Sequence, residues 1–251
     1  MTSAGSPAAA MDDTTLAARV VQVRERIAAA ARRVGRDPAS VRLLAVSKSW
    51  PLTAIEQMAA VSGLRLFGEN RPQELAAKAA AALATDSPVQ FTLIGHLQTN
   101  KVALVAAHAV GFQALDSLRC AHALDAALQA CGRGLDVLIE VNTSGEAAKH
   151  GVGPDEVAGL ARQMAGLDAL RVRGLMTVAL NSPEREPVVA CFERLRETAR
   201  RLRDDGVLGS DWAELSMGMS GDYEWAIEHG ATTVRLGSAL FGPRTPVTTT
   251  G

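Results

Sequence analysis

The sequence is poor in cysteine and in aromatic residues. Its 251 residues include three cysteines, Cys120, Cys131 and Cys191, and one tyrosine, Tyr223, and Phe, Trp and Tyr together make up 4%. The cysteines lie far apart, without the close spacing of a metal-binding or redox motif. We therefore expect them to be small apolar residues of helices in a protein from a reducing compartment.

The sequence also lacks an excess of charge and a long hydrophobic run. Lys and Arg number 26 against 27 Asp and Glu, so the net charge of −1 gives no electrostatic attraction to nucleic acid or to an anionic membrane. No apolar run approaches 18 residues, so no membrane span is predicted. Residues 1–13 have neither the basic region nor the apolar core of a secretory signal, and we expect a disordered tail, with Met11 as a second candidate start. The expected location is the cytoplasm.

Several catalytic motifs are missing as well. The sequence has no GxGxxG after an early strand, no P-loop and no nucleophile elbow. Nor does it contain carboxylates paired at catalytic spacing. Function must therefore be sought in another arrangement of residues.

What the sequence does contain is a regular alternation of short apolar runs and helical segments. Eight parallel strands that alternate with helices predict a single (β/α)₈ barrel, a TIM barrel of the α/β class, over residues 14–244, followed by a flexible tail over residues 245–251. A doubly wound open sheet is the alternative, but it would favour the missing GxGxxG. The expected strands are residues 42–47, 65–67, 89–94, 110–115, 136–141, 170–175, 214–216 and 233–236. The expected helices are residues 14–34, 53–61, 72–83, 101–107, 117–131, 154–165, 186–203 and 223–228.

The first strand ends at Lys48. A lysine is rarely fully buried, and a desolvated lysine with a lowered pKa can form a Schiff base with an aldehyde. The alternative is that Lys48 simply emerges into solvent. The strand alone does not decide between the two, but Lys48 stands at the C-terminal end of a strand, which is where function lies in such barrels.

The segments after the seventh and eighth strands have the composition of a phosphate site. Ser216 and Ser220 bracket a glycine-containing turn, Ser220 is placed to cap the next helix, and Gly237 with Ser238 would let backbone amides approach a ligand. The alternative is that all four are turn and cap residues. Together with Lys48 they suggest a phosphorylated aldehyde held at both ends, and pyridoxal 5′-phosphate (PLP) is the leading candidate.

Three further polar residues lie near strand ends. Arg235 alternates with the apolar residues of the last strand, so it either points into the barrel mouth towards a ligand or pairs with a carboxylate such as Glu140 or Glu69. Asn70 could place a planar amide against a ring, or serve as a turn residue. His96 follows a glycine, where a structural role is the alternative to a role as ligand or base.

These motifs together resemble the family of pyridoxal phosphate homeostasis proteins. The matching stretches cover residues 43–242 and read LLAVSKSWP, FGENRPQEL, FTLIGHLQTNK, VLIEVNTSGEAAKHGV, RGLMTV and LSMGMSGDYEWAIEHGATTVRLGSALFG. The resemblance implies a fold-type III PLP barrel, similar to the N-terminal domain of alanine racemase. It implies Lys48 as the lysine that forms the Schiff base with PLP, phosphate contacts from the four serines and glycines above, Asn70 at the ring and Arg235 near the pyridine nitrogen. His96, Lys149 and Met176 lie in family motifs and are expected at the rim.

The sequence departs from the family pattern in a few places. Arg71 follows GEN where an aromatic residue is usual, and it changes the expected polarity of the pocket entrance. Phe91-Thr92 stands in place of Trp-His, Ser220-Gly221-Asp222 in place of SDD, and Ser238 in place of threonine, which keeps the hydroxyl.

Two functions then remain open: a carrier in vitamin B6 homeostasis that buffers PLP or delivers it to apo-enzymes, and a PLP-dependent amino-acid racemase. The resemblance implies that a racemase of this fold needs a tyrosine base from a C-terminal domain of a partner subunit. The sequence ends at Gly251 without such a domain, and Tyr223 is expected in a helix. We therefore expect a non-catalytic carrier, and a monomer.

Overall fold

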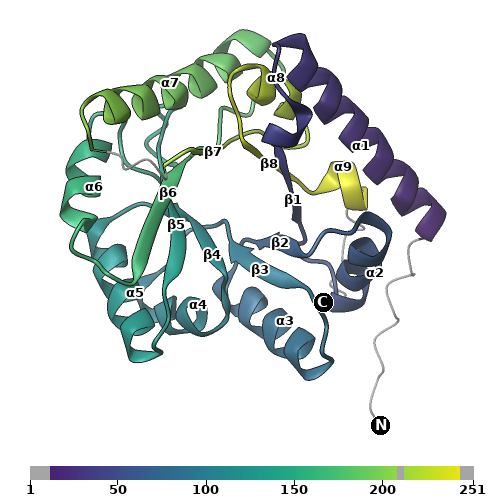
Figure 1. The fold of residues 1–251 in the computed structure, drawn as a ribbon, viewed down its shortest axis with the longest axis horizontal. Coiled ribbons are helices and arrows are strands. Elements are labelled where there is room, and N and C mark those ends of the chain that lie inside the picture. Colours follow the sequence, from purple (N-terminus) through teal and green to yellow (C-terminus); the bar gives the residue numbers. More distant parts are fainter. Residues whose placement is uncertain (1–11, 208–211, 244–251) are drawn as a thin grey trace, which may run out of the picture.

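The structure is a computed structural model that describes residues 12–207 and 212–243. Its eight parallel strands hydrogen-bond in chain order, and β8 pairs with β1, which closes the barrel (Figure 1). The predicted (β/α)₈ barrel is thus confirmed. Most of the expected tails, residues 1–13 and 245–251, lies outside the described residues.

The strands have the lengths typical of a small parallel barrel. They are β1 (Arg42–Val46), β2 (Leu66–Glu69), β3 (Gln90–Leu93), β4 (Gly111–Leu115), β5 (Leu135–Glu140), β6 (Leu170–Met176), β7 (Glu214–Ser216) and β8 (Thr233–Leu236).

The helices cover the outside of the barrel in Figure 1. They are α1 (Asp13–Arg33), α2 (Leu52–Ser62), α3 (Pro72–Ala84), α4 (Val102–His108), α5 (Leu118–Ala130), α6 (Val157–Met164), α7 (Arg185–Asp204), α8 (Tyr223–Glu228) and α9 (Ser238–Phe241), with short 3₁₀ turns at Pro38–Ser40 and Thr99–Lys101.

Local chemistry explains most helix ends. Asp12 caps α1 by accepting hydrogen bonds from the backbone N–H groups of Thr14 and Thr15, and Ser117 caps α5. Seven of the eight expected helices have different boundaries in the structure, most by a single residue at an end. Pro51 is the N-cap residue of α2, so the helix begins at Leu52, one residue before the expected residue 53. Helix α6 begins at Val157, later than the expected residue 154, because the Glu156 carboxylate accepts from the backbone N–H of Gly153 and holds a turn there.

The core lies inside the barrel and between the barrel and its helices. Helix α1 contributes a buried face that includes Leu16, Val20, Val23 and Ile27, as its periodicity predicts. The three cysteines are free; Cys120 and Cys191 are buried in helices as expected, whereas Cys131 is exposed at the end of α5. Among the described residues, none of the helices has the length and apolar character that a membrane span requires.

Candidate functional site

Lys48 lies two residues beyond the end of β1, in a turn at the C-terminal rim, and is half-buried. Both of its neighbours are fixed. Ser47 is fully buried, and its hydroxyl donates to Oε1 of Glu69 at 2.5 Å. Ser49 has a φ of +68°, unusual for a residue other than glycine, and its backbone N–H donates to Oε1 of Glu74 at 2.6 Å. A carboxylate therefore binds each neighbour of Lys48: Ser47 through its hydroxyl and Ser49 through its backbone N–H.

A second lysine joins these two carboxylates. The ammonium of Lys78, in α3, lies 2.7 Å from Oε1 of Glu69 and 2.7 Å from Oε1 of Glu74, and it donates to the backbone carbonyl of Ser47 at 2.9 Å. Its side chain is only 10% exposed. A buried lysine is stable in this form because every hydrogen of its ammonium has an acceptor.

The two carboxyl groups respond differently to this environment. Burial raises the pKa of Glu69 above its ordinary value, although the hydrogen bonds from Lys78 and Ser47 act in the opposite direction. Partial burial also acts to raise the pKa of Glu74, but the hydrogen bonds from Lys78 and Ser49 outweigh it, and the pKa lies below its ordinary value. Oε2 of Glu69 is buried with no hydrogen-bond partner among the described residues.

The end of β1 meets the segment that follows β8. A Cβ atom added to Gly237 would lie 3.3 Å from the carbonyl oxygen of Val46, so the backbone of Gly237 packs closely on the strand that leads to Lys48. The segment after β7 joins them, since the hydroxyl of Ser220 accepts a hydrogen bond from the backbone N–H of Ala239 at 3.3 Å. Residues from the two ends of the sequence are thus brought together.

Ser220 therefore hydrogen-bonds α9, whereas it was expected to cap α8. The predicted cap of α8 is wrong: Asp222 is the N-cap residue, and the carboxylate of Asp222 accepts from the backbone N–H of Met219 at 2.6 Å. Ser220 is half-buried and Ser238 is exposed, so both hydroxyls can be reached from the rim.

Ser216 and Arg235 lie deeper, inside the barrel. The guanidinium of Arg235 donates to the hydroxyl of Ser216 at 2.8 Å and to the carbonyl of Thr177 at 2.7 Å, and the hydroxyl of Ser216 donates to Oε1 of Gln113 at 2.8 Å. Arg235 is 4% exposed. Burial lowers the pKa of Arg235 to about 10, although the charge of Glu140 acts to raise it, so the side chain remains a cation at neutral pH.

The two alternatives for Arg235 can now be compared. Among the described residues its hydrogen bonds go to a hydroxyl and a carbonyl, and not to a carboxylate. Glu69 is paired with Lys78, while Glu140 acts on Arg235 only through its charge. The direct ion pair that was one of the alternatives is absent from the described part of the chain.

Asn70 is half-buried at the end of β2 and borders a cavity of about 630 Å³. The cavity wall also includes Arg71, Glu74 and His96. Arg71 is exposed, and it gives this opening a positive charge where the family pattern has an aromatic ring.

The rim beyond β3 carries a second polar group. Nδ1 of His96 lies 2.8 Å from Oδ2 of Asp116, which directly follows β4. Glu140, the last residue of β5, is 8% exposed, and burial together with the negative charge of Asp116 raises its pKa to about 7. His96 thus has a carboxylate partner, as its structural alternative required, but it remains partly exposed to solvent.

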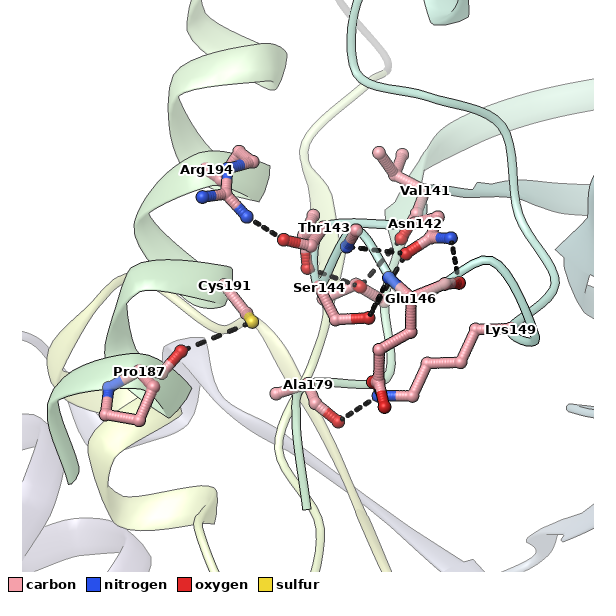
Figure 2. Close-up of polar contacts among 12 residues, drawn as sticks. Val141, Asn142, Thr143, Ser144, Glu146, Lys149, Ala179, Pro187, Cys191 and Arg194 are labelled. Carbon is pink, nitrogen blue, oxygen red and sulfur yellow. Dashed lines mark hydrogen bonds and ion pairs between the residues drawn. The ribbon is translucent and has the colours of Figure 1, made fainter. Parts of the chain in front are cut away.

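The loop after β5 is held by its own side chains (Figure 2). The amide of Asn142 donates to the carbonyl of Glu146 at 2.9 Å and accepts from the backbone N–H of Gly145 at 3.1 Å. The ammonium of Lys149 pairs with Glu146 and donates to the carbonyl of Ala179 at 3.0 Å. Figure 2 also shows Arg194 of α7 donating to the carbonyl of Thr143. Lys149 therefore lies at the rim as expected, anchored to the segment after β6.

The sequence interpretation missed the residues that fix Lys48. Glu74 and Lys78 were expected only as part of the helix over residues 72–83, and Glu69 was considered only as a partner of Arg235 beyond the end of the second strand. One signal was available: Glu74 and Lys78 stand four residues apart, the spacing of a helical ion pair. That spacing does not reveal that Glu69 joins them, because Glu69 comes from another element.

Comparison with known proteins identifies a matching family model and similar full-length relatives. The family model described as the alanine racemase N-terminal domain matches residues 20–245. A pyridoxal phosphate homeostasis protein of Pseudomonas aeruginosa is 43% identical over 231 residues, which cover 92% of this chain and 96% of the relative.

Two solved structures extend the comparison. PipY of Synechococcus elongatus, solved with PLP bound, is 34% identical with a TM-score of 0.74, and the match covers 88% of this chain and 100% of PipY. The alanine racemase of Streptomyces coelicolor shares the fold at 18% identity, with a TM-score of 0.69 over 93% of this chain and 59% of the racemase. By fold, by matching residues and by full-length identity, the chain belongs to the family of pyridoxal phosphate homeostasis proteins.

Proposed function

We propose that the protein binds PLP at the C-terminal rim of the barrel and holds it through a Schiff base with Lys48. Ser216, Ser220, Gly237 and Ser238 would contact the phosphate, Asn70 would lie against the ring, and Arg235 would lie near the pyridine nitrogen. PLP supplies a reactive aldehyde and a ring that draws electrons; the protein supplies the amine, the phosphate contacts and the charge.

One observation carries this proposal: the backbone of Gly237 packs on the end of β1, and Ser220 hydrogen-bonds the segment that contains Ser238. A half-buried lysine and a group of backbone amides and hydroxyls thus share one edge of the barrel. That donor set fits a phosphorylated aldehyde, because an amine meets the carbonyl and uncharged donors meet the phosphate. The names of the relatives, and PipY with PLP bound, support the same ligand.

The remaining residues have roles that follow from their contacts. Lys78 and Glu74 hold the backbone on either side of Lys48, and Glu69 binds the hydroxyl of Ser47, so these three residues would position the amine. Arg235 is a buried cation that donates to neutral oxygen atoms, and it favours an unprotonated nitrogen beside it. An unprotonated ring stabilises a carbanion weakly, which is compatible with a carrier of PLP but does not by itself exclude a racemase.

The position of Tyr223 argues against a racemase, the alternative function. Tyr223 is buried in α8, on the outside of the barrel, and the guanidinium of Arg26 in α1 lies 5.4 Å from the centre of its ring. A tyrosine in this position cannot serve as the second base of a racemase. We therefore propose that the protein buffers PLP and delivers it to apo-enzymes.

The absorption spectrum tests both parts of the proposal. The four lysines of the chain are Lys48, Lys78, Lys101 and Lys149. PLP added to the parent protein is expected to give the visible band of a protonated Schiff base, which Lys48→Ala loses and the matched rim variant Lys101→Ala keeps. An unchanged band in Lys48→Ala would exclude Lys48. Exchange of the Cα hydrogen of alanine in deuterated water at enzyme-like rates would instead favour the racemase.

A further inference from the structure

We propose that His96, Asp116 and His150 form a binding site for a divalent transition-metal ion such as Zn²⁺. The three residues follow β3, β4 and β5 at the same rim of the barrel. None of them is assigned to PLP in the proposed function, so the two proposals stand independently.

The geometry brings three ligand atoms to one point. Nδ1 of His96 lies 2.8 Å and Nδ1 of His150 lies 3.9 Å from Oδ2 of Asp116. All three ligand atoms lie within 4.8 Å of one another. Metal–ligand bonds of about 2.0–2.2 Å place the ligands of a tetrahedral zinc ion at separations of roughly 3.3–3.6 Å, so small side-chain movements suffice.

The donor set selects the class of ion. Two imidazoles and one carboxylate suit zinc and its neighbours in the first transition row, whereas Mg²⁺ and Ca²⁺ prefer oxygen ligands. Three protein ligands also leave a position open to water. The ion would take the place of the proton between Nδ1 of His96 and Asp116: a neutral imidazole would then carry its proton on Nε2, and an imidazolium would release its Nδ1 proton to solvent.

Two of the three ligands are positioned by the strand ends. Asp116 stands between the last residue of β4 and Ser117, which caps α5, so its backbone is fixed on both sides. Gly95 precedes His96, and a Cβ atom there would lie 2.4 Å from the carbonyl oxygen of Asn70. Only glycine allows this close packing, which sets where His96 leaves the strand.

His150 is placed by the loop shown in Figure 2. On one side, Lys149 is anchored to Ala179 and Glu146. On the other, Gly151 has a φ of +103°, and a Cβ atom there would lie 2.8 Å from the backbone nitrogen of Asn142. Next along the chain, Val152 pairs with Val141 of the segment after β5. The backbone of His150 is thus held at the rim while its side chain, 58% exposed, can turn.

Binding needs one rearrangement. The rings of His96 and His150 are stacked, with centroids 4.0 Å apart and planes 8° from parallel. A metal ion lies in the plane of each imidazole that binds it, so the rings must rotate apart around the ion. The exposed ring of His150 has room to make this rotation. Without an ion, the same residues form a stacked histidine pair on a carboxylate.

Zinc titration against a competing chromophoric chelator tests the site. The background is the full-length chain carrying Cys131→Ser, which removes the exposed thiol as another zinc ligand, without added PLP and in phosphate-free buffer. One ion per chain is expected. Removal of one ligand by His150→Ala should weaken zinc binding at least tenfold. His122→Ala, at an exposed histidine of α5 outside the cluster, should leave the affinity unchanged.

Asp116→Asn gives a second variant that keeps the shape of the side chain, and it should also weaken zinc binding at least tenfold. Circular dichroism checks that each variant is folded. Cobalt(II), which gives visible bands sensitive to coordination number, should report a four- or five-coordinate ion in the background protein. The proposal is overturned if the background protein binds no zinc, or if folded His150→Ala and Asp116→Asn bind it as tightly as the background does.

Discussion

Two sides of the barrel rim each contain a buried carboxyl group, but the two groups differ in their charged partners. On the β1–β2 side, Glu69 shares a buried lysine with Glu74. On the β3–β5 side, the described residues include no ion pair to Glu140. After burial, the largest influence on its pKa is the negative charge of Asp116, and the charge of Arg235 acts in the opposite direction. Both carboxyls are nearly or fully buried, so the difference lies in their partners.

This difference suits the two sides of the rim to different functions. On the β1–β2 side, hydrogen bonds from Lys78 to the carbonyl of Ser47 and from the backbone N–H of Ser49 to Glu74 fix the backbone on either side of Lys48, which is what a covalent tether requires. On the β3–β5 side, two stacked histidines gather at Asp116, whose ion pairs within the described part of the chain are with these histidines, an arrangement that a metal ion would complete. The predictions below alter one side at a time.

Removal of Lys78, the cation shared by Glu69 and Glu74, should cause the largest loss of unfolding free energy. Lys78→Met leaves Glu69 buried without its partner, and the loss of one partner of a buried pair costs about 3–5 kcal/mol of unfolding free energy. Urea unfolding at pH 7 measures this loss. The double variant Lys78→Met/Glu69→Gln should recover part of it, because the remaining side chain then carries no charge. Equal stability of the parent and Lys78→Met would contradict the account of this side.

On the β3–β5 side, the carboxyl group of Glu140 should make the free energy of unfolding depend on pH. The pKa of Glu140 is about 7 in the folded protein and near 4.5 when unfolded, so its contribution to stability is full below pH 4.5 and is lost as pH rises through 7. The loss amounts to roughly 3 kcal/mol. Glu140→Gln should therefore lose less stability than the parent between pH 5 and pH 8. The exposed control Glu25→Gln should follow the parent; a Glu140→Gln curve parallel to the parent's would refute the assignment.

A matched pair of glycines tests the loop that carries His150. Gly151→Ala meets both a positive φ and the backbone of Asn142, and we expect a cost of about 1–3 kcal/mol and weaker zinc binding. Gly145 also has a positive φ, +74°, but an added Cβ atom would meet nothing within 4 Å, so Gly145→Ala should cost only about 1 kcal/mol. Unfolding in urea and zinc titration measure both variants. If Gly145→Ala were the more damaging, the close packing at Gly151 would not be what places His150.

The fold was predictable from the sequence because its signals are local. The apolar runs and helix periodicity predicted every strand of the barrel, and residues 214–216, 233–236 and 223–228 match β7, β8 and α8. Helix α9 was not expected, since Ser238–Phe241 is too short to show a period. Glu69 was placed in a loop because GEN resembles a turn, whereas β2 continues through it to pair with β3.

The candidate site was predictable only in part. Strand ends and serine- or glycine-rich segments indicated Lys48, Ser220, Gly237 and Ser238, and barrel closure brings them to one edge. The partners of Ser216 and Arg235 could not be predicted, because Gln113 and Thr177 come from other strands and meet them only inside the closed barrel. The same holds for His96, Asp116 and His150, which no spacing in the sequence connects.

Chemical mapping of the reduced lysine tests the central claim most directly. The protein is mixed with PLP, reduced with borohydride, digested and analysed by mass spectrometry for the pyridoxyl group. The account predicts the group on Lys48, whose backbone is held beside Gly237 at the end of β1. A pyridoxyl group found mainly on Lys101 or Lys149, with Lys48 unmodified, would contradict it.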